Sequence, residues 1–512
     1  MQPLTSRLLA SIERTGNRLP DPATLFFFAA VLVMVVSQIG DALDWRVTKT
    51  VMLTDGTLQQ VEVAAVGLLD SDGVWWVFSH LVDNFMSFPP LGLVLVAMLG
   101  IGVAERSGMV SALLRTAVSR SPAALLTPVV FFLGVMSSLA LDAGYIVLPP
   151  LAAVLFMAAG RSPLAGLATA FAGVSAGFSA NLLVTAIDPL LAGFTQAGAQ
   201  LLDQGYQVSA TANWWFMIVS TVVLTGVGWW VTSRIVEPRL NSQPQSARAT
   251  AEGDAGALTV GDEARGLRWA LIALAIALTA VLAMILVPGA PLHGQGGRFD
   301  RWVEAMVPLL LVLFVVPGIA FGFGAGTLRG NKDVARLMGD TMAGLGPYIV
   351  LAFFAAQFIA FFKQSQLGEM LAIVGGQALA GADLALWVLV AVFMAVAMTG
   401  NLFIGSASAK YAFLSPVFVP MFMQVGISPE LTQAAYRVGD SVTNVITPLN
   451  PYMVIVLAFL QHYAPRAGIG TLVALMLPYA LAFALVWPLL LLVWMALGIP
   501  LGPAGPLWYP AD

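Results

Sequence analysis

Residues 400–452 place charged and amide side chains within an otherwise strongly apolar chain. The stretch contains Lys410, Arg437 and Asp440, and it is interrupted by several prolines, which break or kink helices. In a bilayer, charged groups are costly and persist where they face a protein interior or a water-filled cavity. We therefore interpret this stretch as one half of a binding site.

The composition predicts that the whole chain is a membrane protein. It has 512 residues, of which 59% are hydrophobic and only 10% are charged, whereas soluble domains carry about 25% charged residues. The net charge of −4 offers no basic surface for nucleic acid. The lack of cysteine excludes disulfides and thiolate metal sites, so we expect no cofactor of that kind.

A second polar stretch in the first half of the chain resembles the first. The sequence NLLVTAIDP at 181–189 is similar to NVITPLNP at 444–451. Allowing a one-residue gap, both contain asparagine, an apolar pair, threonine, and then aspartate or asparagine before proline. Each pattern indicates a helix that is unwound partway across the membrane.

The segments before these two stretches also match each other. SSLALDAGY at 137–145 resembles GSASAKYAF at 405–413, which places Asp142 opposite Lys410. Each lies in an apolar segment that is too long for one span and is interrupted by prolines, as expected for a re-entrant helical hairpin. The same order of elements occurs twice, which is typical of transporters built from inverted repeats.

The elements that would position these residues are apolar helices. We predict an all-α polytopic membrane protein with nine transmembrane helices and two re-entrant helical hairpins in an inverted repeat. The hairpins are expected at 125–157 and 386–424, and the broken helices at 164–188 and 429–460. The other spans are expected near residues 25–39, 91–104, 214–232, 267–286, 303–319, 348–362 and 472–497.

The predicted organisation follows from these spans and from the loop charges. Arginine and lysine concentrate in loops on one side when the N-terminus is cytoplasmic and the C-terminus periplasmic. The second repeat is then inverted relative to the first. The five predicted parts are an N-terminal span and external segment at 1–87, a first repeat at 88–233, a cytoplasmic loop at 234–266, two connecting spans at 267–345 and a second repeat at 346–512.

Broken helices can bind both an anion and a cation. The N-terminus of a half-helix attracts anions, while unwound carbonyls and side-chain oxygens can coordinate Na⁺. Asn181, Asp188 and Asn444 could form such a Na⁺ site, or the carboxylates could carry a proton instead. The candidate ion-coupling residues are Asp142, Asn181, Asp188, Asp440, Asn444 and Thr447.

Arg437 has two possible roles. It lies three residues before Asp440, so the two side chains share one face of a helix. They could form an internal ion pair. Alternatively, Arg437 could bind the carboxylate of a substrate while Asp440 takes part in ion coupling.

Several long motifs resemble those of the p-aminobenzoyl-glutamate transporter (AbgT) family. They include GIGVAERSG, GFSANLLVTAIDP, GSASAKYAFLSPVFVPM and AAYRVGDSVTNVITP, and the resemblance extends along nearly the whole chain. It implies a homodimeric secondary transporter of the bacterial inner membrane. It also implies aromatic carboxylate substrates such as p-aminobenzoyl-glutamate, and members are associated with efflux of sulfonamide drugs.

The resemblance also transfers functional positions to this chain. Those positions are Asp188, Asn401, Ser408, Pro429, Arg437, Asp440 and Pro448. Tyr411 stands where the family has tryptophan, which keeps a ring and adds a hydroxyl, and KQSQLG at 363–368 has glutamine where members tend to have asparagine. The expected substrate-binding residues are Asn401, Ser408, Tyr411, Pro429, Arg437 and Pro448.

The leading hypothesis is a secondary transporter coupled to H⁺ or Na⁺. Import of p-aminobenzoyl-glutamate and export of sulfonamide-type antimetabolites would use the same pocket, so the direction stays open. The alternatives are an uncoupled channel and an intramembrane hydrolase, for which Asp188 with Asp440, or Ser408 with Lys410, would supply the catalytic pair. The sequence lacks HExxH and GxxxxGK[ST] motifs, which disfavours a metallopeptidase and a nucleotide-driven pump.

Overall fold

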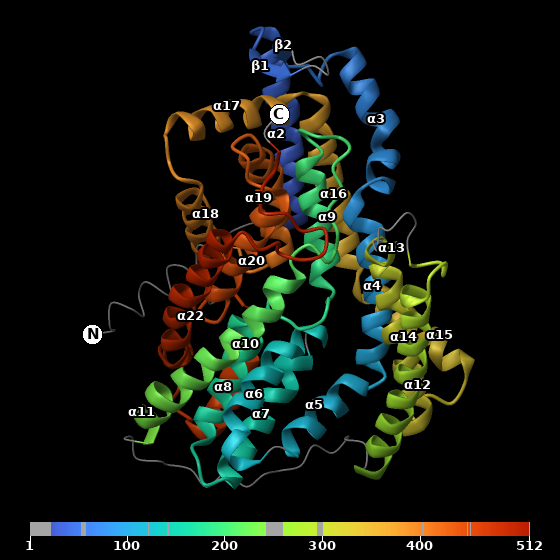
Figure 1. The fold of residues 1–512 in the computed structure, drawn as a ribbon, viewed down its shortest axis with the longest axis vertical. Helices are drawn as coiled ribbons and strands as arrows, with labels where there is room; N and C mark the ends of the chain where they lie inside the picture. The colour runs from blue at the N-terminus through green and yellow to red at the C-terminus, as the bar shows by residue number, and fades with distance from the viewer. Residues whose placement is uncertain are drawn as a thin grey trace.

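The computed structural model is mostly helical (Figure 1). It describes residues 22–52, 58–120, 122–140, 143–241, 260–293, 301–401, 404–447, 449–450 and 452–510. Within these ranges, 7 helical segments are long and apolar enough to cross a membrane. They are Pro22–Ala42, Ser71–Arg106, Trp214–Leu240, Gly261–Leu286, Met306–Ala325, Gly346–Gln364 and Ile469–Leu497. The expected multi-pass helical fold is confirmed, and the count of nine spans stays a prediction.

The chain begins with a span, a β-hairpin and a second long helical segment. The span α2 (Pro22–Ala42) leads into β1 (Arg46–Met52), which pairs antiparallel with β2 (Leu58–Ala64). The sequence analysis expected only a polar segment here, although the alternating β-branched residues of these strands have the period of a sheet. Helix α3 (Ser71–Met86) follows and is capped by Asp70, which accepts a hydrogen bond from the Gly73 amide at 2.6 Å.

The first half of the molecule continues with seven elements in a recurring order. A long helix and a short helix precede a two-helix hairpin, a helix broken in the middle, and another long helix. They are α4 (Pro89–Arg106), α5 (Met109–Ser119), α6 (Leu126–Met136), α7 (Ala143–Ala158), α8 (Pro163–Ala176), α9 (Ile187–Ala199) and α10 (Trp214–Val231). The 3₁₀ turn η2 (Ser137–Ala140) lies at the hairpin tip, where a Cβ on Gly144 would collide with the Ser137 hydroxyl.

The same order of elements occurs again in the second half. They are α16 (Gly346–Gln364), α17 (Leu367–Gly381), α18 (Leu386–Gly400), α19 (Ala407–Met423), α20 (Pro429–Asn444), α21 (Met453–Tyr463) and α22 (Ile469–Leu497). Both predicted interrupted segments therefore form pairs of helices, and both predicted broken helices are broken. The structure adds α17, which the sequence analysis did not separate from its neighbours. The inverted relation of the two halves, and the five-part division, stay predictions.

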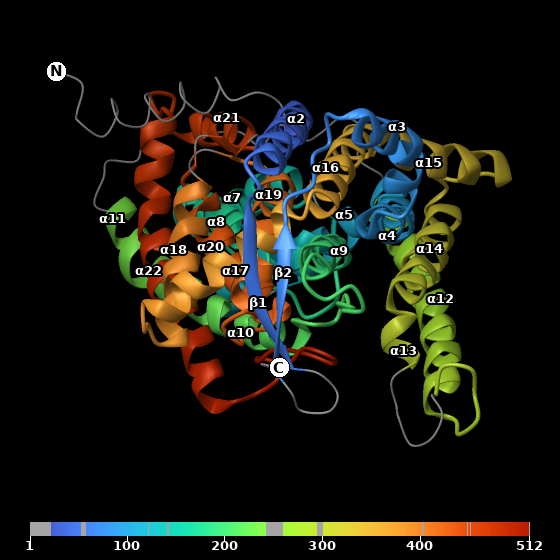
Figure 2. The same cartoon turned by 90° about the horizontal axis from the view of Figure 1, so that it is seen from above.

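A helical connection joins the two halves. Helix α10 passes through the π-helical turn η3 (Thr232–Val236) into α11 (Glu237–Asn241). After the connecting loop come α12 (Val260–Leu286), α13 (Arg301–Glu304), α14 (Met306–Ala325) and α15 (Asn331–Gly344). Helix α14 packs on both α12 and α4. In Figure 2 they lie at one side of the molecule, and α10, α18 and α22 lie at the other.

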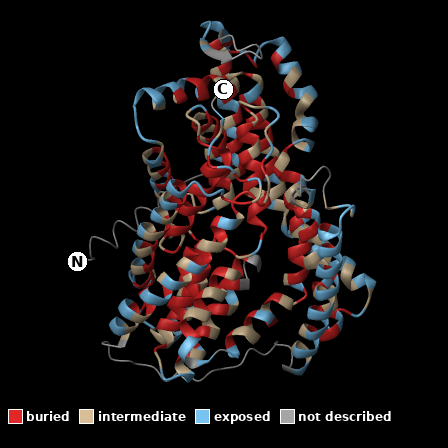
Figure 3. Ribbon diagram, in the orientation of Figure 1, coloured by how far each residue is buried: buried red, intermediate tan, exposed pale blue. Residues whose placement is uncertain are grey.

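Burial is greatest in the two broken helices at the centre (Figure 3). Helix α8 is built mainly of alanine and glycine, which let neighbouring backbones approach closely. A Cβ on Gly173 would lie 2.6 Å from the Phe131 carbonyl oxygen, so only glycine permits this contact with α6. Helix α20 is polar in sequence, yet nearly all of its residues are buried. A polar helix surrounded by protein is the core feature of the molecule.

The segment after α22 covers the start of α20. The Ser428 hydroxyl donates to the Pro506 carbonyl at 2.7 Å, and the Ser428 amide donates to the Leu507 carbonyl at 3.2 Å. The Tyr509 amide donates to the Gly426 carbonyl at 2.9 Å. We call residues 501–509 the C-terminal strap, since they fasten the beginning of α20 to the loop before α10.

Candidate functional site

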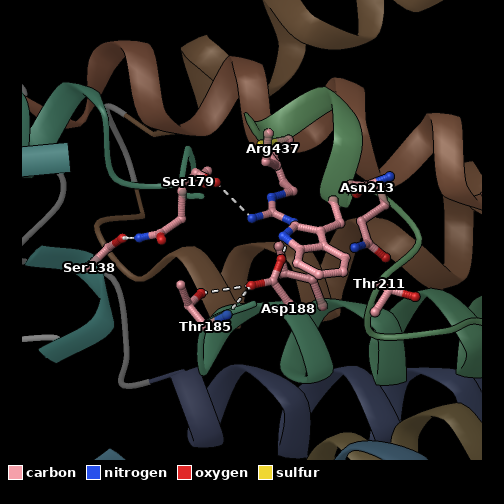
Figure 4. Close-up of polar contacts among 12 residues, drawn as sticks. Ser138, Ser179, Thr185, Asp188, Thr211, Asn213 and Arg437 are labelled. Atoms are coloured by element: carbon pink, nitrogen blue, oxygen red, sulfur yellow. Dashed lines mark hydrogen bonds and ion pairs between the residues drawn. The ribbon is translucent and has the colours of Figure 1, made fainter. Parts of the chain in front are cut away.

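Arg437 on α20 forms a buried ion pair with Asp188 from the other half of the molecule (Figure 4). Its Nη1 lies 2.6 Å from Asp188 Oδ1, and its Nη2 donates to the Ser179 carbonyl at 2.7 Å. The other Asp188 oxygen, Oδ2, accepts from the Thr185 amide at 2.6 Å and hydroxyl at 2.8 Å. Both carboxylate oxygens of Asp188 are therefore engaged at the break between α8 and α9.

Asp440 forms a separate buried ion pair with Lys410 from α19. Both side chains are 2% exposed. The Tyr436 hydroxyl lies 3.2 Å from Asp440 Oδ1 and 2.6 Å from the Ala407 carbonyl at the start of α19. The ion pair between Arg437 and Asp440, one of the two alternatives, is not formed, because each residue finds a partner on a different helix.

Asn401 supports the same region from the end of α18. Its Nδ2 donates to the Asp440 carbonyl at 2.7 Å and to the Thr443 hydroxyl at 3.2 Å. Asn401 is buried, and its side chain holds the second hairpin against α20. This position is structural in the conformation observed.

The asparagines of the two breaks bind backbone and hydroxyl groups. Asn181 Nδ2 donates to the Ser138 hydroxyl at 2.9 Å, at the tip of the first hairpin. Asn450 Nδ2 donates to the Ser175 hydroxyl at 3.2 Å, and Asn444 Nδ2 reaches the Ser175 carbonyl at 3.4 Å. The break in the second half is therefore attached to the end of α8 in the first.

A cavity of about 350 Å³ lies where the hairpin ends and the breaks meet. Its walls come from α4, the start of α7, the first break, the start of α16, residues 405–408 and the second break. Small-molecule sites occupy about 300–1,000 Å³ and are largely apolar with a few polar groups. The polar groups here include Ser408, Asn444 and Asn450, and Tyr145, Tyr348 and Tyr452 add aromatic walls. This cavity is the candidate substrate site.

A larger hollow of about 790 Å³ lies between α10 and α22. Apart from Arg239, its walls are apolar or glycine, and they include the exposed side chains of Trp230, Leu481 and Leu485. It lies on the outer faces of two spans, where lipid would cover it. Its lining lacks the convergent polar groups of the smaller cavity.

The structure brings together only some of the residues predicted to bind substrate. Ser408 lines the cavity, whereas Asn401, Tyr411, Pro429 and Arg437 are buried outside its lining. The Tyr411 hydroxyl lies 2.7 Å from the Thr195 hydroxyl, and its ring packs on Tyr436 at 4.3 Å. Pro448 and Asp142 lie outside the described residues. A direct role in binding or coupling stays a prediction for all of these positions, including Ser408.

The structure also places the candidate ion-coupling residues in different surroundings. Asn444 lines the cavity, Asp440 is paired with Lys410, and the Thr447 hydroxyl accepts from the Leu449 amide at 3.3 Å. In the part of the chain that the structure describes, no group of three or more histidine, cysteine or acidic residues could hold a metal. The Na⁺ site expected near Asn181, Asp188 and Asn444 stays a prediction, and the adjacent Arg437 charge opposes a cation at Asp188.

Glu430 is a buried carboxylate that the sequence analysis missed. It is 1% exposed, and Oε2 accepts a hydrogen bond from the Tyr206 hydroxyl at 2.9 Å. Among the described lysines and arginines, none forms an ion pair with it. The sequence Ser428-Pro429-Glu430 is typical of an ordinary helix N-terminus. Its partner Tyr206 is 224 positions away in the chain, and a contact of this kind leaves no local signal in the sequence.

Broken helices whose ends meet at a central cavity define a class of protein, the secondary transporters. The chain belongs to the AbgT putative transporter family, whose family model matches residues 7–509. This confirms the resemblance of its motifs. The multiple apolar helices and the family together make it a multi-pass protein of the inner membrane.

Individual relatives agree with this assignment. The p-aminobenzoyl-glutamate transport protein of Escherichia coli (strain K12) is 34% identical over 506 residues, which cover 98% of this chain and 96% of that protein. The Alcanivorax borkumensis YdaH transporter has a TM-score of 0.89 and 46% identity, covering 94% of this chain and 100% of its own. Neisseria gonorrhoeae MtrF, from a class of antimetabolite efflux pumps, has a TM-score of 0.87 and 41% identity, covering 98% and 100%. These relatives are transporters rather than enzymes.

Proposed function

We propose that this protein is an ion-coupled secondary transporter of p-aminobenzoyl-glutamate or related aromatic carboxylates. Its direction is export, and sulfonamide-type antimetabolites are among the compounds that it exports. The cavity at the hairpin ends is the observation that carries the proposal. Its volume suits a small organic acid, and its mixed aromatic and polar walls suit a ring joined to a carboxylate. The similarity to an aminobenzoyl-glutamate transport protein and to an antimetabolite efflux pump supports the same ligand class.

The Lys410–Asp440 pair is the proposed site of proton coupling. Lys410 follows two residues after Ser408, which lines the cavity, so a ligand and a proton would act on the same helix. Both members of this pair can change protonation, whereas an arginine stays charged. Asp188 is therefore assigned to holding Arg437 rather than to carrying the proton.

Sodium coupling is the second candidate. The second break places Asn450 in the cavity lining, Thr447 lies three residues before it, and oxygen groups of this kind suit Na⁺. We also propose a homodimer with a cytoplasmic N-terminus. Arginines on α5, α11 and the start of α12 support this orientation, since these elements lie at one end of the molecule (Figure 1).

Transport in proteoliposomes tests the proposal. Radiolabelled p-aminobenzoyl-glutamate flux is measured with pH and Na⁺ gradients imposed separately, in the wild type and in Asp440→Asn. The exposed Asp340→Asn on α15 serves as the matched carboxylate control. The expected result is flux that follows an opposing proton gradient, is lost in Asp440→Asn and is kept in Asp340→Asn.

The other outcomes separate the alternatives. Flux that follows only the Na⁺ gradient would replace proton coupling with sodium coupling. Flux indifferent to both gradients and to the substitution would make the protein an uncoupled channel. Release of free p-aminobenzoate by the purified protein would identify a hydrolase instead of a transporter.

A further inference from the structure

Two tyrosines from opposite halves of the molecule stack against each other at the cavity. Tyr145 lies at the start of α7, on the tip of the first hairpin, and Tyr452 directly precedes α21 after the second break. Their ring centroids are 4.2 Å apart and their planes differ by 7°. Both rings line the cavity.

This geometry differs from the other aromatic contacts nearby. Phe171 meets Tyr145 at 6.1 Å and 61°, as an edge contact. Aromatic pairs in proteins favour such edge contacts or offset stacks, because the ring faces carry negative charge and the edges positive charge. Among the described ring pairs, Tyr145 and Tyr452 are the closest, and they are nearly parallel. A flat stacked surface of this kind is suited to a third flat ring.

Burial determines the side from which a ring can approach. Tyr145 is only 3% exposed and contacts both Phe171 and Tyr452. Tyr452 is the more exposed of the two. A planar ligand would therefore add to the stack on the Tyr452 side, with Tyr145 and Phe171 supporting that ring from behind.

Polar groups lie around the same surface. Asn444 and Asn450 come from the break that carries Tyr452, and Ser408 lies in the first turn of α19. Helix α19 presents its N-terminal amides at the cavity, where they favour a negative group. A ligand with a ring at one end and a carboxylate at the other would match both kinds of wall.

We propose that the Tyr145–Tyr452 stack selects ligands by their aromatic ring. The ring of the substrate stacks on Tyr452, and the pair discriminates a planar aromatic acid from a saturated acid of the same size. This inference rests on the proposed function, because it names how the transport site recognises the aromatic part of its substrate. It also makes ligand binding sensitive to a contact that joins the two halves.

Two matched ligands test this selection. Benzoyl-glutamate is compared with cyclohexanecarbonyl-glutamate, which has the same six-carbon ring size and the same carboxylates but no π-face. Competition for radiolabelled p-aminobenzoyl-glutamate is measured on the full chain in proteoliposomes. One aromatic stacking contact accounts for about a five- to tenfold difference in affinity, so the wild type should favour the aromatic ligand by about that factor.

Substitutions assign the preference to the stack. Tyr452→Phe keeps the ring and should keep the preference, whereas Tyr452→Leu should reduce it to about twofold or less through weaker binding of the aromatic ligand. Tyr145→Leu should act in the same direction. Tyr463→Leu, at the far end of α21 from Tyr452, is the matched control and should leave the preference unchanged.

The outcomes are distinguishable from failure of the proposed function. If the wild type carries p-aminobenzoyl-glutamate but binds both ligands equally, the stacking inference is overturned while the transport function stands. An unchanged preference in folded Tyr452→Leu and Tyr145→Leu would overturn it as well. If the wild type carries no aromatic carboxylate, both proposals fall. If the leucine variants do not fold, a wild type that binds both ligands equally still overturns the inference.

Discussion

The two buried ion pairs on α20 differ in what they connect. Arg437 reaches Asp188 in the first half of the molecule, while Asp440 is held by Lys410 from the second hairpin. The first pair is fixed further by the Ser179 carbonyl. In the second pair, Lys410 lies on α19, and the first turn of this helix lines the cavity. One pair joins the two halves, and the other lies beside the proposed transport site.

The basic residue of each pair fits this difference. An arginine stays protonated when buried, whereas a lysine can lose its proton. The Arg437–Asp188 pair is therefore a permanent electrostatic bond. The Lys410–Asp440 pair can exist in more than one protonation state, which a proton-coupled transporter needs. Breaking a buried pair by removing one partner leaves an uncompensated charge, and the consequences should differ between the two.

The largest effect is expected from Arg437→Met. It leaves the Asp188 carboxylate buried without a cation, which should lower the free energy of unfolding by about 3–5 kcal/mol. The measurement is thermal unfolding of the purified protein in detergent. The double variant Arg437→Met with Asp188→Leu should recover part of the loss, because no buried charge remains. A single variant as stable as the wild type would contradict the role of this pair as a bond between halves.

The next prediction compares the two acids directly. Asp188→Asn should destabilise the protein more than Asp440→Asn, because Arg437 stays charged while Lys410 can release its proton. In Asp440→Asn the folded state then binds fewer protons than the unfolded state. Its stability should therefore rise as the pH is raised, whereas that of Asp188→Asn should not. Unfolding measured over a pH series checks this, and equal pH dependence of the two variants would remove the distinction.

Glu430 tests what a buried acid without a basic partner contributes. Glu430→Gln keeps the acceptor for the Tyr206 hydroxyl and removes the need to bury a charge. The free energy of unfolding should change by no more than about 1 kcal/mol. Thermal unfolding beside Asp188→Asn provides the comparison. A loss as large as that of Asp188→Asn would show that the ionised carboxylate is a structural requirement.

A comparably small change is expected from Tyr436→Phe. It removes a hydroxyl that lies near Asp440 and the Ala407 carbonyl but keeps the ring that packs on Tyr411. The cost should be about 1 kcal/mol, the typical value of one hydrogen bond. The pH profile of flux should also shift in this variant, because the hydroxyl lies beside the proposed site of proton coupling. An unshifted profile would limit Tyr436 to packing.

The interruptions of the fold were predictable from the sequence because their causes are local. Proline and polar residues inside apolar segments break helices wherever those segments lie, so the interruptions of both segments and of both broken helices were anticipated. The β-hairpin and α17 were missed, because short amphipathic or alternating segments give weak signals beside long apolar spans. Their positions depend on packing, as in the hydrogen bond from the Val66 amide to the Ser365 carbonyl at 3.0 Å.

The sequence predicted which residues belong to the site better than it predicted which of them pair with each other. Arg437 and Asp440 were correctly placed among the buried polar residues, but helical spacing suggested that they pair with each other. The actual partner of Arg437 is 249 positions away in the chain. The tyrosine stack likewise joins positions in different halves. Contacts of this kind depend on how the two halves pack against each other. Neighbouring residues in the sequence carry no information about that packing.

The C-terminal strap has a consequence for biogenesis. Residues 501–509 leave the ribosome after every segment that they bind, including Ser428 and the loop before α10. Until then the start of α20 lacks these hydrogen bonds to Ser428 and Gly426. The helices can enter the membrane in chain order, but the polar centre of the second half is sealed only after translation has passed the strap. Docking of the strap is therefore a step in the maturation of this transporter that is separate from the insertion of its spans into the bilayer.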